Sequence, residues 1–392
     1  MKRIIIGIPS LNSGGVEVSL VRFVKELSRN KNYKISLLLL KKEGIYLEDI
    51  PKSVNILTVK FDDDIYSYFK KIGDIKSVSG IFNKVNFFFY RNNLRKYLKS
   101  NDWESYYKLL LSHTLDIDGE YDLAIDWHGY GNFITSVIAD KVVAKKRATW
   151  IHDEKCEWLN KVNFWLDKYN RIFCVGKSCL NNVLKYDSSL KNKVEIFYNM
   201  TDYVNVRKKS AAKIDFSFDK NKVNIVTVGR LEWQKGYDIA IGTAKILKEK
   251  GINFCWYVIG TGSLRVELQK LTLENGVSDY LKFLGVVKNP FPYVKNADFF
   301  VLTSRHEGYC LATLEAKILG SVIIATDIES NREQIVDEKN GFLCNLDSLS
   351  FANKIIELCN DKKKITVVKD NLANENFDYS SEFKKLEKLM EE

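Results

Sequence analysis

The chain has 392 residues, of which 45% are hydrophobic and 28% are charged. This length predicts two domains of roughly 150–200 residues, and the composition excludes a fibrous or wholly disordered protein. The formal net charge is +10, and the excess lies in the first 200 residues, which hold 32 Lys and Arg against 23 Asp and Glu. A basic first half favours a phosphate-bearing ligand, an anionic surface or a nucleic acid as partner.

The N-terminus predicts a first strand rather than a targeting signal. Its apolar run, residues 3–8, is short and is followed by Pro9 and by the glycines Gly14 and Gly15. No stretch of the sequence reaches the ~20 apolar residues of a membrane-spanning helix. The 7 cysteines are scattered and form no CxxC pair, which favours reduced thiols over a zinc site or a disulfide framework. We expect a cytoplasmic protein that could bind peripherally to the inner face of the cell membrane.

Apolar runs alternate with helix-period segments along the chain, which is typical of parallel strands joined by crossover helices. Strands are predicted at 3–8, 34–40, 54–59, 121–127, 147–152, 171–176 and 194–199, then at 222–230, 254–260, 281–285, 298–304, 321–326 and 341–344. Helices are predicted at 16–29, 237–250, 263–275, 310–319 and 348–360. The polar segment 201–221 is interpreted as an interdomain linker. The pattern indicates two doubly wound α/β domains with a cleft between them.

Residues 65–100 form a basic, aromatic segment with eight Lys and Arg against one acidic residue. One interpretation is an anionic membrane surface that carries a lipid-diphosphate-linked glycan. Another is a helical insertion that packs its aromatic side chains into the core, and a nucleic-acid binder would use the same segment. The preceding Asp62–Asp64 run is interpreted as solvated charge rather than a metal site.

Two stretches of the second half carry candidate ligand-binding residues. The first, "VTVGRLEWQKGYDIAI" (226–241), places Arg230 directly after a strand that ends at Gly229, and Lys235 before a helix. Such cations suit a diphosphate, because Arg binds it bidentately and Lys as a point charge. Solvated surface cations beside a turn are the alternative. The "GTG" at 260–262 is too weak for a dinucleotide fingerprint.

The second stretch, "SRHEGYCLATLEAK" (304–317), contains two glutamates eight positions apart, Glu307 and Glu315. On one continuous helix these carboxylates would lie about 80° apart rather than stacked and would not cooperate well on one face. We therefore predict a loop with Gly308 and Glu307 at its mouth, followed by a helix from about Cys310 with Glu315 a turn deeper. The first N–H groups of such a helix favour an anion. The pieces suit an activated sugar, although a surface helix with exposed glutamates remains the alternative.

Together these stretches resemble the C-terminal half of retaining glycosyltransferases of family 4, whose nucleotide-sugar-dependent members have the GT-B fold and an EX7E motif. "VIGTGSLRVELQKL", "LKFLGVVKNPFPYVKNADFFVLTS" and "GSVIIATDIESNREQIVDEKNGFLC" occur in the family's order. "IPSLNSGGVEVSLVRFVKEL" is similar to its N-terminal glycine loop and first helix. The resemblance covers nearly all of the chain, most specifically 222–345.

The resemblance implies a role for each matching position. Arg230 and Lys235 would bind the donor diphosphate, Glu315 the ribose hydroxyls, and Glu307 the transferred sugar near its reacting carbon. His152 would approach the sugar from the first domain, and His128 is its rival for that role. The other implied donor contacts are Gly14, Gly15, Gly229, Val287, Gly308, Tyr309, Cys310, Leu311 and Ala312. Cys310 and Lys317 depart from the family's usual residues and leave the choice of sugar open.

The resemblance also implies the organisation of the whole chain. Residues 1–203 would form an acceptor-binding Rossmann-like domain and 204–375 a donor-binding one, both facing a central cleft. Residues 376–392 would form a C-terminal helix that could pack back on the N-terminal domain. The reaction would be metal-independent, without a cofactor, with a nucleoside-diphosphate sugar, most naturally a UDP-sugar, as co-substrate. A non-catalytic GT-B partner subunit and a nucleic-acid-binding protein are the competing interpretations.

Overall fold

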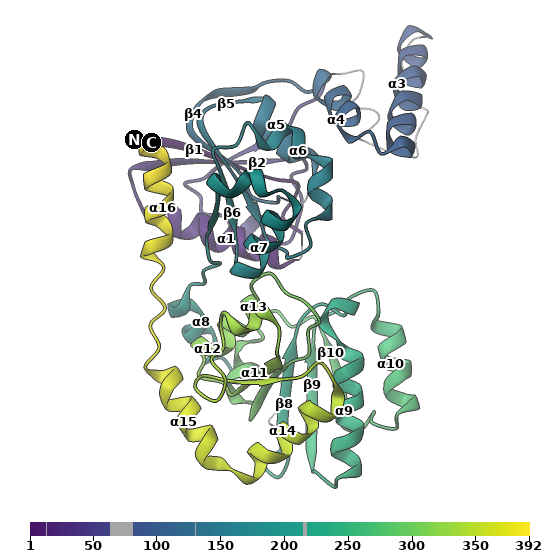
Figure 1. The fold of residues 1–392 in the computed structure, drawn as a ribbon, viewed down its shortest axis with the longest axis vertical. Coiled ribbons are helices and arrows are strands. Elements are labelled where there is room, and N and C mark those ends of the chain that lie inside the picture. Colours follow the sequence, from purple (N-terminus) through teal and green to yellow (C-terminus); the bar gives the residue numbers. More distant parts are fainter. Residues whose placement is uncertain (13, 63–80, 130, 215–217) are drawn as a thin grey trace. The chain divides into compact units, whose positions relative to one another are not determined.

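The computed structural model describes residues 1–392 except 13, 63–80, 130 and 215–217, and it divides the chain into two compact α/β units (Figure 1). The first unit comprises Met1–Val175, Cys179–Tyr198 and Ser380–Glu392. The second comprises Gly176–Ser178 and Asn199–Tyr379. Among the helices formed by the described residues, none is long and apolar enough to cross a bilayer.

The described part of the first unit contains a seven-stranded parallel sheet in the order β3-β2-β1-β4-β5-β6-β7. Its strands are β1 (Lys2–Ile8), β2 (Tyr33–Leu39), β3 (Asn55–Thr58), β4 (Ile117–Asp126), β5 (Val142–Ile151), β6 (Arg171–Cys174) and β7 (Val194–Ile196). Its main helices are α1 (Gly15–Leu27), α3 (Ile81–Ser100), α4 (Trp103–Ser112), α5 (Phe133–Asp140), α6 (Asn163–Leu166), α7 (Lys177–Tyr186) and α16 (Ser380–Glu391), with 3-10 turns η1 (Leu47–Asp49), η3 (Glu157–Lys161) and η4 (Ser188–Asn192).

The second unit contains, in its described part, a six-stranded parallel sheet in the order β10-β9-β8-β11-β12-β13. Its strands are β8 (Val223–Val228), β9 (Phe254–Ile259), β10 (Leu281–Gly285), β11 (Phe299–Leu302), β12 (Ile323–Thr326) and β13 (Phe342–Cys344). Its helices are α8 (Tyr203–Lys209), α9 (Tyr237–Glu249), α10 (Arg265–Glu274), α11 (Phe291–Asn296), α12 (Leu311–Ile318), α13 (Glu329–Arg332), α14 (Ser348–Asn360) and α15 (Lys362–Ala373), with the 3-10 turn η5 (Trp233–Lys235).

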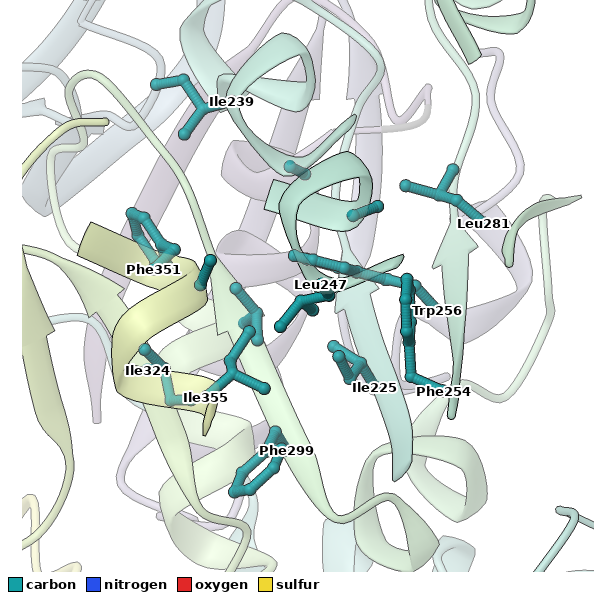
Figure 2. Packing of buried hydrophobic residues seen from close by; sticks show 14 of the residues in the cluster. Ile225, Ile239, Leu247, Phe254, Trp256, Leu281, Phe299, Ile324, Phe351 and Ile355 are labelled. Carbon is teal, nitrogen blue, oxygen red and sulfur yellow. The ribbon is translucent and has the colours of Figure 1, made fainter. Parts of the chain in front are cut away.

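Both faces of the second sheet are covered by apolar side chains, as expected when crossover helices lie on both sides. Strand β9, which lies between β10 and β8, is buried along its whole length, "FCWYVI". On one face, Phe351 and Ile355 of α14 pack against the sheet together with Leu247 of α9 (Figure 2). The side chain of Asp347 caps α14 by accepting the Ser350 N–H at 2.7 Å, which starts this helix where its apolar stripe begins.

The C-terminal helix α16 packs on the first unit, close to the N-terminus (Figure 1). The Lys2 ammonium donates to the Met390 carbonyl at 3.0 Å, and Arg171 donates to both carboxylate oxygens of Glu392 at 2.9 and 2.8 Å. Phe383 stacks on Phe23 with ring centroids 5.9 Å apart. The last segment of the chain therefore completes the first unit rather than the second.

Two sequence interpretations need correction. Segment 201–221 is not merely a linker, because its residues 203–209 form α8, whose buried Val206 packs with Leu314 and Ile318 of α12. Strands β4 and β5 also begin several residues before the predicted starts, where charged residues hide the apolar pattern.

The basic segment 65–100 is described only in part. Residues 65–80 lie outside the described residues, as do Asp63 and Asp64, and α3 begins at Ile81. In the second half of α3, Tyr90 and Leu94 are buried in the core, whereas Arg95 and Lys96 are exposed. One face of this part of the helix therefore packs into the core, and the other face exposes positively charged side chains.

Candidate functional site

The strand order of the second sheet places a binding site where its sequence order reverses. β8 and β11 are neighbours, with Phe299 opposite Ile225, and β9 and β12 continue in opposite directions from this pair. In open parallel sheets, ligands bind outside the carboxyl ends of the strands at such a switch point. The loops after β8 and β11 are the two stretches that carry the predicted donor residues.

These two loops, about 70 residues apart in sequence, are tied together by hydrogen bonds. The Gln234 amide donates to the His306 carbonyl at 2.9 Å, and the Arg305 N–H donates to the Gln234 carbonyl at 2.7 Å. The Thr303 hydroxyl donates to the Lys235 carbonyl at 3.0 Å. The fold therefore fixes the Lys235 side chain relative to the loop that carries Glu307.

Lys235 and Glu307 form a buried ion pair at the centre of this arrangement. Lys235 Nζ lies 2.6 Å from Glu307 Oε1, and the two side chains are only 15% and 7% exposed. Ser304 Oγ donates to the same Oε1 at 2.6 Å. Burial lowers the pKa of Lys235 and is the largest single effect, but the charge of Glu307, its hydrogen bond and Cys310 together outweigh it, so the pKa of the ammonium is raised. Lys235 therefore stays charged at neutral pH.

The expectation that Glu307 stands at the mouth of the loop is wrong. Its carboxylate is buried under Lys235 and Ser304, whereas Glu315, one helix turn into α12, is only half-buried. The reason is the ion pair: a carboxylate can be buried when a cation and a hydroxyl satisfy it. Both hydrogen bonds within the described residues go to Oε1, and this leaves Oε2 to accept from a ligand hydroxyl.

Arg230 supplies an additional positive charge on the same side. It lies two residues after the end of β8 and is exposed, and among the described residues no carboxylate lies within ion-pair distance of it. Its charge acts on Lys235 and tends to lower the pKa of that ammonium, which shows that the two cations share one neighbourhood. Glu307 neutralises Lys235, and Glu232 of the same loop, whose pKa Arg230 helps to lower, offsets the charge of Arg230, so that Arg230 is a local rather than a net excess of positive charge.

The N-terminus of α12 faces these groups through the Glu307–Cys310 loop. Cys310 is the N-cap residue, in extended conformation, and its side chain makes no capping hydrogen bond. The first N–H groups of α12 thus have no intrahelical partner, and they are suited to an anion. The Cys310 thiol itself is buried, and burial raises its pKa, so it is an inert packing residue rather than a nucleophile.

Two glycines are required by close backbone contacts around the site. Gly236 has φ = 63°, and a Cβ there would lie 2.1 Å from the Thr303 carbonyl oxygen. Gly260, in the "GTG" stretch, has φ = 146°, and its Cβ would lie 1.9 Å from the Gly229 carbonyl oxygen. The glycines of "GTG" therefore serve the packing of two loops, in agreement with their rejection as a dinucleotide fingerprint.

Lys317, which departs from the residue expected at this position, ties α12 to other parts of the second unit. Its ammonium donates to the Gln334 carbonyl at 2.7 Å and pairs with the Glu375 carboxylate, and its side chain is 8% exposed. The Gln334 amide in turn donates to the Cys310 carbonyl at 3.3 Å. Lys317 thus positions the helix that carries Glu315.

The remaining implied donor contacts of the second unit lie around the same loops. Gly308 is buried, Tyr309, Leu311 and Ala312 are half-buried, and Val287 is half-buried in the loop after β10. Tyr309 and Leu311 pack against the cluster that contains Leu314.

In the first unit, the predicted residues also follow the carboxyl ends of adjacent strands. Gly14 is the N-cap of α1 in extended conformation, and Gly15 opens the helix. His152 follows β5 directly, and its Nε2 lies 2.7 Å from the Trp127 carbonyl. Burial lowers the pKa of His152 to about 3 and that of His128 to about 4, so both imidazoles are neutral at pH 7.

A buried carboxylate supports this histidine region and was missed by sequence reasoning. Asp126, at the end of β4, accepts hydrogen bonds from the Thr135 hydroxyl at 2.7 Å and the Thr149 hydroxyl at 2.9 Å. Burial raises the pKa of Asp126, although these hydrogen bonds oppose the rise. The Gly129 N–H also donates to it at 3.3 Å, which fixes the turn that carries His128. The sequence does place Asp126 two positions before His128, and this spacing could have predicted that the carboxylate lies close to the histidine.

Known proteins are similar to the part of the chain that carries these loops. Residues 208–374 match the family of glycosyl transferases group 1. This region contains the whole set of loops described above in the second unit. An uncharacterized protein of the cps region of Klebsiella pneumoniae is 27% identical over 245 residues, which are 58% of this chain and 65% of that protein. The lipopolysaccharide core biosynthesis glycosyltransferase LpsE of Rhizobium meliloti is 27% identical over 176 residues, or 45% of this chain and 50% of LpsE.

The chain thus spans about half to two thirds of the length of these two relatives. Among solved structures, TarM of S. aureus superposes with a TM-score of 0.70 and 14% identity over 100% of both chains. This likeness concerns the fold alone. It confirms the predicted fold class, two Rossmann-like α/β domains of the GT-B kind.

Proposed function

We propose that this protein is a retaining glycosyltransferase that moves a hexose or N-acetylhexosamine from a nucleoside-diphosphate sugar to a hydroxyl of a glycan or lipid-linked acceptor. The observation that carries the proposal is the group formed by Arg230, the Lys235–Glu307 pair and the uncapped start of α12 at the β8/β11 switch point. Surface polysaccharide synthesis is the proposed context, since the relative LpsE has a role in lipopolysaccharide core biosynthesis.

In this proposal the two cations hold the donor diphosphate. Arg230 binds it from the solvent side and Lys235 from the buried side, while α12 directs its first N–H groups toward it. Glu315 takes the ribose hydroxyls and Glu307 Oε2 a hydroxyl of the transferred sugar. A UDP-sugar is the favoured donor, and TarM of S. aureus, a structure of similar fold, was solved with UDP. We expect no metal requirement because the protein supplies the cations.

Transfer would proceed by front-face displacement. The bond from the sugar carbon to the diphosphate oxygen breaks, and the acceptor oxygen attacks the same face, with its proton passing to the departing diphosphate. We assign Glu307 no covalent role, because Lys235 and Ser304 hold its Oε1 and a hydroxyl of the sugar takes its Oε2. Electrostatic stabilisation of the leaving group by Arg230 and Lys235 would then be the main catalytic contribution.

The acceptor is proposed to bind the first unit, and α3 could bring that unit to an anionic membrane. Arg95, Lys96 and Lys99 are exposed on this helix, and Leu98 is 40% exposed beside them. Flotation with anionic liposomes at low salt tests this part. Protein that stays in the soluble fraction would contradict the membrane contact.

A thermal-shift panel of UDP-, GDP-, dTDP- and ADP-sugars tests the donor assignment. A ligand at 100 times its Kd adds about 2.7 kcal/mol to the stability of the folded state. We expect one class of donor to raise the unfolding temperature of the wild type and of Lys245→Ala, an exposed cation on α9, but much less that of Arg230→Ala. A panel without any stabilising donor would contradict the proposed function.

A further inference from the structure

A groove in the first unit lies between the start of α4 and the loop that follows β5. Its volume is about 590 Å³, and it is a shallow depression open to solvent. Two tryptophans, Trp103 and Trp158, and two amides, Asn101 and Asn160, line it together with two acidic and two basic side chains. All of these residues belong to one unit, and none has a role in the donor site proposed above.

The local structure holds the two indoles at the groove. The Asp102 carboxylate caps α4 by accepting the Ser105 N–H at 3.1 Å, so that Trp103 opens the helix. On the other side, the buried side chain of Leu159 anchors η3 to the core and leaves its neighbour Trp158 half-buried. The Lys161 ammonium lies 4.7 Å from the centre of the Trp103 ring. Both walls of the groove are therefore fixed by capped or packed elements.

The backbone at the rim is left-handed at one residue. Asn101 has φ = 55°, and among the described non-glycine residues only Glu338 shares a positive φ. This conformation is the ordinary end of α3: the Asn101 N–H donates to the Leu98 carbonyl and the Asp102 N–H to the Tyr97 carbonyl at 2.9 Å, the pattern of a left-handed helix C-cap in which asparagine is common. Here the conformation turns the chain from α3 into α4 and brings the Asn101 amide to the groove.

The chemistry of the lining fits an uncharged carbohydrate. Indole rings offer flat apolar surface for the C–H face of a pyranose, while amides and carboxylates exchange hydrogen bonds with its hydroxyls. The two acidic and two basic side chains balance one another. A phosphate, a nucleic acid or an anionic lipid would instead require a net positive lining.

We propose that this groove binds a neutral sugar unit of the acceptor glycan, with Trp103 and Trp158 against its rings and Asn101 and Asn160 on its hydroxyls. Its role as an acceptor subsite rests on the proposed function, whereas its capacity to bind sugar does not. Asp153, which lines the groove, directly follows His152 in the chain. The subsite would therefore belong to the strand end that also carries the candidate histidine.

The test is saturation-transfer NMR on the full chain with maltotriose, chitotriose and mannotriose as probes. We expect at least one probe to bind, with its affinity lowered about 3- to 10-fold by Trp103→Ala or Trp158→Ala. Tyr203→Ala, which removes an exposed aromatic ring of the second unit, should leave the affinity unchanged. Asn160→Ala provides a second, exposed variant if loss of an indole prevents folding, and it too should weaken binding.

Two results would overturn the proposal: none of the three probes binds, or both tryptophan variants bind as the wild type does. UDP binding, measured on the same samples, separates this inference from the proposed function. Loss of the sugar signal with intact UDP binding would refute the groove alone. Sugar binding without UDP binding would refute the donor assignment and leave the groove as a carbohydrate site.

Discussion

Replacement of Lys235 by methionine is expected to destabilise the second unit strongly. The Lys235 and Glu307 side chains are 15% and 7% exposed, and their charged atoms lie 2.6 Å apart. Removal of the cation leaves the carboxylate buried with only the Ser304 hydroxyl as its partner among the described residues. Breaking a buried pair from one side costs about 3–5 kcal/mol. For a domain of this size the loss corresponds to a fall of roughly 6–20 °C in unfolding temperature.

The appropriate measurement is a double-mutant cycle in differential scanning calorimetry. Lys235→Met and Glu307→Gln should each lower the unfolding temperature, because each leaves a buried polar group without its partner. The double variant removes both charges and should recover most of the loss, since the pair itself adds little net stability. Additive losses in the double variant, or a Lys235→Met protein that unfolds with the wild type, would refute the buried ion pair.

Three further predictions concern other residues. Gly251→Ala is expected to lower the free energy of unfolding by about 1 kcal/mol, and Gly236→Ala by more. Both glycines have a positive φ, but only at Gly236 would the added Cβ clash with a carbonyl oxygen. Thermal unfolding of the two variants compares these losses. Burial lowers the pKa of His128 from 6.5 to about 4, so its contribution to stability is full above pH 6.5 and falls by about 2–3 kcal/mol by pH 4.5. His152, with a pKa lowered to about 3, adds a similar loss, and His128→Gln should remove only the share of His128 in urea titrations. Lys317→Met should lower the free energy of unfolding by about 1–3 kcal/mol, as should Glu375→Gln, because each breaks their ion pair.

Different outcomes would contradict each of these predictions. Equal stability of Gly236→Ala and Gly251→Ala would mean that the loop contact relaxes without cost. Identical pH dependence in the wild type and His128→Gln would show that this imidazole is not kept neutral by burial. If Lys317→Met unfolds at the same urea concentration as the wild type, Lys317 does not stabilise α12.

Much of the fold could be predicted because buried parallel strands appear in the sequence as continuous apolar runs. β9 is buried throughout and its sequence contains no charged residue. The ends of β8 and β11 were predictable for the same reason, and Arg230 and Glu307 were placed on loops by their distance from those runs. The start of β4 was missed because its first residues are exposed and charged.

The burial of charged residues could not be predicted from the sequence. Glu307 is buried because Lys235, 72 positions earlier, reaches it, and Lys317 is buried because Glu375 returns to it from beyond α15. A charge without a visible partner is expected at the surface. The packing of α16 on the first unit depends likewise on partners far away in sequence, such as Lys2 and Arg171.

The central claim is that the loops after β8 and β11 stabilise a departing nucleoside diphosphate, and Arg230 provides the cleanest test. Its side chain is exposed and unpaired among the described residues, so Arg230→Ala should change folding stability by less than about 0.5 kcal/mol. The decisive measurement is the rate of nucleoside diphosphate release from the donor that gives the largest thermal shift. We predict a loss of about 10²–10³-fold in Arg230→Ala and none in Lys245→Ala. Release at the wild-type rate by Arg230→Ala would contradict the account.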